Sequence, residues 1–147
     1  MTLERIAAAV VGTVAAILAA SWASHVYTVT DPWKPYVIAT REYMAAGVRS
    51  DSGALVRHSA AAQPVAWVLD ATRRRPGMVA AWARELRGGA GERRGDTVVL
   101  ALWADNVEGC SHLNSVSALL LNHSATPRVL AISSPCIDRR PLPSLPW

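Results

Sequence analysis

Residues 6–22 read IAAAVVGTVAAILAASW, a run without a charged side chain in which Thr13 and Ser21 are the most polar positions. Continued to Tyr27, this run measures roughly 33 Å as a helix at ~1.5 Å per residue, close to the ~30 Å core of a bilayer. The pattern therefore predicts a transmembrane signal-anchor helix over residues 1–27, with the rest of the chain held at a membrane.

A cleaved signal peptide is the competing interpretation. Arg5 precedes the apolar run, and Ser21-Trp22-Ala23 is an acceptable cleavage triplet. Trp22, Tyr27 and Trp33 instead form an interfacial aromatic belt, which favours an uncleaved anchor. Arg5 on the short side predicts a cytoplasmic N-terminus, with the domain in the periplasm at the inner membrane of a bacterium.

Small residues recur four positions apart on one face of this helix, at Ala8, Gly12, Ala16 and Ala20. Such a ridge lets another helix backbone approach closely, although an alanine-rich helix also produces it by accident. The hypothesis is that this face packs against transmembrane helices of other subunits, with the lipid bilayer as the second partner.

The composition allows one domain after the helix, because the chain has 147 residues of which 51% are apolar. The net charge is +4, and Lys34 is the one lysine among fifteen basic residues. This arginine bias is attributed to a GC-rich genome, and no nucleic-acid partner is predicted.

A basic patch is predicted at Arg73, Arg74, Arg75, Arg84, Arg87, Arg93 and Arg94. It is either a solvated face or a surface for anionic lipid headgroups or an acidic partner.

The order of elements predicts an α+β domain in which helices pack on a small antiparallel β-meander. A linker at 28–35 holds two Xaa-Pro pairs, and the domain follows at 36–135. Helices are expected at 36–48, from Ser50 or Asp51 to about 58, from 63–64 to 75, and at 78–86. GGAGERRG at 88–95 is assigned to a turn or a mobile loop, and strands are expected at 96–103, 114–123 and 128–134. Residues 136–147 form a proline-rich tail, either free or extended on a neighbour with Trp147 as its anchor.

Cys110 and Cys136 are the two cysteines of the chain. Outside the cytoplasm such a pair is typical of a disulfide, here tying a loop to a strand end; two buried thiols are the alternative.

Residues 36–60, YVIATREYMAAGVRSDSGALVRHSA, resemble the opening of NTF2-like (cystatin-like α+β cone) domains. The resemblance implies a long helix, a capped turn and a short helix before a curved sheet that encloses a pocket. Enzymes of that family carry Asp/His pairs inside the cone, and the nearest candidates here are Asp70, His112 and His123. Their spacing, and that of His58, is not typical of a metal or catalytic site, so no catalytic residue, cofactor or metal is predicted.

Three functions remain open. The first is a non-enzymatic, single-pass accessory subunit that packs against and stabilises a larger membrane protein complex, of the respiratory or photosynthetic kind. The second is a membrane-tethered NTF2-like protein that binds a small ligand in its cone. The third is an enzyme of that fold, which needs a paired acid and base inside.

Overall fold

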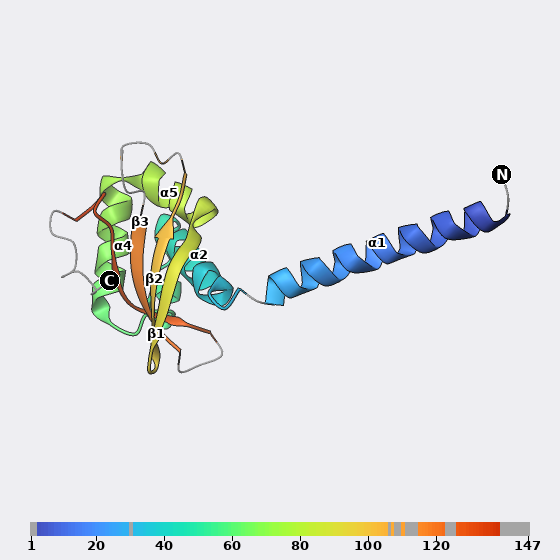
Figure 1. Ribbon diagram of the computed structural model, residues 1–147. Coiled ribbons are helices and arrows are strands. Elements are labelled where there is room, and N and C mark those ends of the chain that lie inside the picture. The colour runs from blue at the N-terminus through green and yellow to red at the C-terminus, as the bar shows by residue number, and fades with distance from the viewer. Residues whose placement is uncertain are drawn as a thin grey trace. The chain divides into compact units, whose positions relative to one another are not determined.

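The computed structural model describes residues 3–29, 31–105, 107, 110, 115–122 and 126–138. The chain divides into two compact units, Met1–Pro32 and Trp33–Trp147. Helix α1 (Leu3–Val29) makes up the first unit. The second unit contains the remaining helices and the sheet (Figure 1).

The predicted membrane anchor is contradicted by the structure. Among the described residues, no helix is both long enough and apolar enough to cross a bilayer. The single-pass architecture and the inner-membrane location predicted from the sequence are therefore wrong.

The second unit has an α+β fold. Its helices are α2 (Lys34–Val48), α3 (Ser52–Arg57), α4 (Ala62–Arg74) and α5 (Pro76–Glu85). Its strands are β1 (Arg87–Arg94), β2 (Thr97–Trp103), β3 (Ser115–Leu121) and β4 (Arg128–Ser133). The strands pair antiparallel in the order β1-β2-β3-β4, while α2 and α4 pack against the sheet (Figure 1).

Alternate residues of the central strands form the sheet side of the core. In β2 these are Val98, Leu100 and Leu102, and β3 contributes Val116, Ala118 and Leu120 at the same face, all fully buried. This period of two is the one that a strand with a covered face requires. The helices bury their own large side chains against it, among them Tyr43, Met44, Val68 and Trp82.

Strand β1 occupies the segment for which the sequence predicted a turn. Its glycines allow close approach, because a Cβ atom on Gly88 would come within 3.0 Å of Val37 on α2, and one on Gly91 would come within 2.6 Å of the ring of Trp33, the N-cap residue of α2. Arg93 of the same strand donates a hydrogen bond to the Tyr36 hydroxyl oxygen at 3.1 Å. Pairing with β2 and contact with α2 thus outweigh the weak strand propensity of glycine.

The outer edge of β4 is occupied by the connection between α3 and α4. Ala60 donates its backbone N–H to the Val129 carbonyl (2.7 Å), and Val129 donates to the His58 carbonyl (2.8 Å). Further along, the Gln63 side-chain amide bonds both the N–H and the carbonyl of Ile132, at 3.1 and 2.9 Å. Residues 58–63 are therefore fixed to the sheet although they lie outside it.

Candidate functional site

Helix α1 presents an apolar surface to solvent, because every one of its described side chains is exposed. Its large apolar side chains are between 45% and 71% exposed, at Ile6, Val10, Val11, Val14, Ile17, Leu18 and Trp22. At 100° per residue these seven positions fall within an arc of about 160°. We call this arc the large face of α1.

The opposite arc of α1 holds Arg5 near its N-terminal end and is otherwise formed, among the described side chains, by the small residues Ala9, Gly12, Thr13, Ala15, Ala16, Ala19 and Ala20, which include part of the predicted packing ridge. A Cβ atom on Gly12 would meet no atom within 4 Å, and Ala16 and Ala20 are exposed. The side chains of Ala8 and Tyr27 lie outside the described part of the chain. The helix thus has a small face opposite its large face.

Trp33, predicted as an interfacial aromatic, belongs to the second unit. Its ring lies against Gly91 and is tilted at 51° to the Tyr36 ring, with 6.4 Å between centroids. Trp22, by contrast, is 71% exposed on the large face of α1.

The predicted basic patch is spread over α4, α5 and β1, and several of its arginines are paired. Arg73 and Arg74 each lie 2.6 Å from an oxygen of Asp70. Arg87 pairs with Asp105, and Arg94 pairs with Glu92 at 2.8 Å. These ion pairs are solvent-exposed and add little to stability, but they reduce the net positive charge of the surface.

Of the polar residues considered for catalysis, the structure describes Asp70 and His58, which belong to different elements. Asp70 lies on α4, and the pKa of its carboxyl is lowered chiefly by the hydrogen bond that Arg73 donates to it. His58 is exposed at the end of α3, while His112, His123 and Trp147 lie outside the described residues. Within the described ranges no group of three or more His, Cys, Asp or Glu is placed to hold a metal ion.

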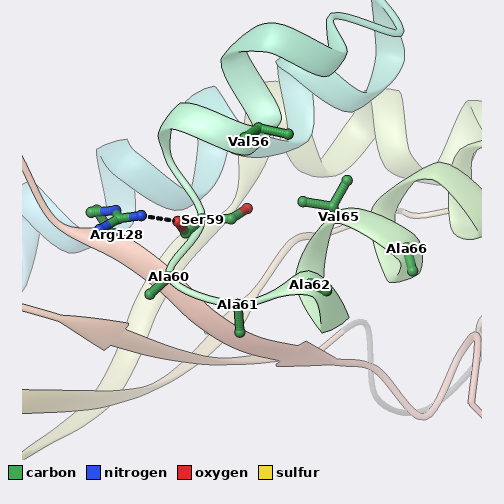
Figure 2. Close-up of a pocket in the computed structure, with 8 residues that line it drawn as sticks. All are labelled: Val56, Ser59, Ala60, Ala61, Ala62, Val65, Ala66 and Arg128. Carbon is green, nitrogen blue, oxygen red and sulfur yellow. Dashed lines mark hydrogen bonds between the residues drawn. The ribbon is translucent and has the colours of Figure 1, made fainter.

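A pocket of about 520 Å³ opens between α3 and the start of α4 (Figure 2). Its wall consists of short aliphatic side chains together with one serine and one arginine: Val56, Ser59, Ala60, Ala61, Ala62, Val65, Ala66 and Arg128. Sequence reasoning missed this pocket, because its residues are alanines and valines that carry no motif. A pocket of this volume lies within the range of small-molecule sites.

Ser59 connects the pocket wall to the core. Its hydroxyl lies 2.5 Å from the Tyr43 hydroxyl and 2.6 Å from the Leu55 carbonyl. Burial raises the pKa of the Tyr43 hydroxyl above its usual value, and the hydrogen bond with Ser59 offsets part of that rise. The neutral phenol is therefore the form that the folded domain favours.

We expect ionisation of Tyr43 to make the domain less stable at alkaline pH. Since folding raises the pKa of Tyr43, its contribution to the free energy of unfolding is complete below the unfolded pKa of about 10. This contribution is lost as the pH rises through the pKa that Tyr43 has in the folded domain. Urea unfolding between pH 8 and 11 measures this loss. Tyr43→Phe should show a shallower decline above pH 10 than the wild type, whereas equal slopes would contradict the assignment.

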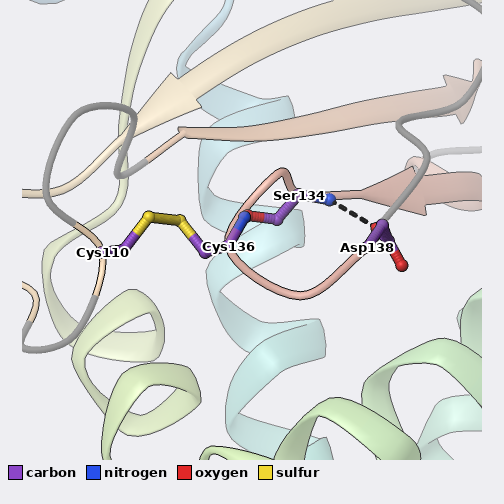
Figure 3. The surroundings of a disulfide bond; sticks show 4 residues. All are labelled: Cys110, Ser134, Cys136 and Asp138. Carbon is purple, nitrogen blue, oxygen red and sulfur yellow. Dashed lines mark hydrogen bonds between the residues drawn. A yellow bond between two sulfur atoms is a disulfide. The ribbon is translucent and has the colours of Figure 1, made fainter.

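A disulfide joins Cys110 to Cys136 across 26 positions of sequence, with 5.6 Å between the Cα atoms (Figure 3). Beside it, the Asp138 carboxylate accepts hydrogen bonds from the Ser134 N–H (2.9 Å) and from the Trp67 indole N–H (2.9 and 3.1 Å). Ile137 is 7% exposed within the core. Residues 136–138, which the sequence assigned to the tail, are thus part of the folded domain.

Comparison with family models, with curated proteins and with solved structures finds no match to this chain. The NTF2-like resemblance of residues 36–60 therefore stays a prediction.

Proposed function

We propose that this protein is a non-enzymatic accessory subunit that joins a larger protein assembly through α1. The observation that carries the proposal is the exposure of seven large apolar side chains on one helix. A helix with so much apolar surface is normally buried against a partner.

The two faces of α1 suit association with other helices. Burying apolar surface stabilises a complex by about 25 cal/mol per Å², so the large face provides the driving force. The small face lets a neighbouring backbone approach closely, which increases van der Waals contact. The partner is therefore a protein that presents apolar helices.

The non-enzymatic part of the proposal is supported by the roles of the polar side chains in the second unit. Asp70 pairs with Arg73 and Arg74, and Asp138 binds Trp67 and Ser134. The Asp70 carboxylate is paired within α4, and the Asp138 carboxylate links α4 to the end of β4, so both are engaged in structural contacts and are poorly placed to act as a general acid or base.

The test is the native mass and composition of the full chain purified under mild conditions from its own cells. We expect it to co-migrate with other proteins in a fixed ratio. Val14→Gln combined with Leu18→Gln should release it, because glutamine keeps the helix propensity and removes apolar surface. Gly12→Leu should also release it by filling the small face.

The matched control is Ile38→Gln combined with Val48→Gln, two positions on α2 that are 43% and 41% exposed. This variant should co-migrate as the wild type does. Migration of the wild-type chain alone, or retention of the α1 variants in the assembly, would overturn the proposal.

A further inference from the structure

The pocket between α3 and α4 combines an aliphatic wall with a single positive charge. Six of its eight lining residues are alanine or valine. Arg128, at the start of β4, lies beside Ser59 at one end of the lining (Figure 2). Among the described residues no carboxylate forms an ion pair with Arg128.

The Arg128 guanidinium is held in place and still has donors available. One of its terminal nitrogens donates to the Ser59 carbonyl oxygen. A guanidinium carries five N–H groups, in a planar fork that matches the two oxygens of a carboxylate. The remaining donors thus give the pocket a site for one anionic group.

The pocket wall is fixed before any ligand arrives. Backbone hydrogen bonds join Ala60 and His58 to Val129, and the Ser59 hydroxyl is bonded to Tyr43 and Leu55. At the other end of this segment, the Gln63 side chain forms two hydrogen bonds with the backbone of Ile132. Together these bonds engage the His58 carbonyl, the Ala60 N–H and the Gln63 amide, and alanine and valine side chains make up the aliphatic part of the wall. A preformed wall of this kind lowers the ordering cost of binding.

We propose that this pocket binds an aliphatic monocarboxylate, with the hydrocarbon chain on the Ala/Val wall and the carboxylate on Arg128. Among the described residues, the wall carries no aromatic ring on which a base or another flat ring would stack. The described lining contains one cation, which matches one negative charge rather than a polyphosphate. The site lies in the second unit and does not depend on the proposed role of α1.

Calorimetric titration of the full chain with octanoate, and with octanamide as its neutral analogue, tests the proposal. We expect saturable binding of octanoate at one site, about tenfold or more tighter than octanamide, because a charge-assisted hydrogen-bonded pair is lost with the amide. Arg128→Gln should weaken octanoate binding by a similar factor and leave the affinity for octanamide unchanged. Arg128→Lys keeps the charge without the planar fork, so its affinity for octanoate should lie between those of the wild type and Arg128→Gln.

Two further variants separate this pocket from the exposed surface of α1. Ala66→Leu adds side-chain volume to the lining and should abolish binding of both compounds. Arg57→Gln removes an exposed charge at the end of α3, outside the pocket, and should bind as the wild type does. Far-UV circular dichroism and the unfolding temperature show that each variant is folded.

Equal affinity for octanoate and octanamide would overturn the proposal. A loss of octanoate affinity in Arg57→Gln as large as that in Arg128→Gln would also overturn it. The same holds if folded Ala66→Leu binds octanoate as the wild type does. Absence of saturable octanoate binding by the wild type would overturn it as well.

Discussion

Replacing Trp82 with alanine is expected to lower the free energy of unfolding of the second unit by about 3–5 kcal/mol. Trp82 is fully buried in the core, on α5, which packs against α2 and α4. Its ring stacks on Trp67 with 6.2 Å between centroids and 20° between planes. Truncation removes this stacking and leaves a cavity that the surrounding helices fill only in part. Urea unfolding followed by far-UV circular dichroism measures the change.

Trp82→Phe is the control that separates ring packing from polarity. The indole Nε1 of Trp82 is buried and has no hydrogen-bond partner in the described structure. Phenylalanine keeps an aromatic ring against Trp67 and removes this unsatisfied donor, so we expect a loss of about 1–2 kcal/mol. An equal loss in Trp82→Phe and Trp82→Ala would show that the alanine effect does not come from the cavity.

The parts of the fold that local pattern determines were predictable. Short apolar runs, rich in β-branched residues in β2, indicate strands at β2 and β3, and the structure has strands there. Asp51 was one of two candidate caps for the short helix, and its carboxylate accepts a hydrogen bond from the Ala54 N–H at 3.0 Å. These signals lie within a few residues of the feature that they specify.

The parts that depend on distant partners were not predictable. Strand β1 has the composition of a turn, and its strand conformation depends on pairing with β2 and on the contact of Gly91 with Trp33. The pocket depends on Ser59 meeting β4 and on Gln63 bonding Ile132, 69 positions away. No single-sequence pattern encodes such a pairing, because the glutamine is an ordinary surface residue until the edge of β4 lies beside it.

The second large effect is expected from loss of the disulfide. Replacing Cys110 and Cys136 together with serine should lower the free energy of unfolding by about 3–4 kcal/mol, the chain-entropy value for a loop of this length. The bridge anchors the turn at 134–138, so its loss also weakens the hydrogen bonds that Asp138 makes with Ser134 and Trp67. Urea unfolding of the oxidised wild type and of the double variant measures the difference.

Reduction of the wild-type chain provides the matched control, because it breaks the same bond without changing a residue. Dithiothreitol should shift the urea midpoint of the wild type toward that of the double variant and leave the double variant unchanged. A double Cys→Ala variant shows how much of the loss comes from placing serine hydroxyls at these half-buried positions. If the urea midpoint of the wild type is the same with and without reductant, the disulfide does not stabilise the domain, and the prediction is contradicted.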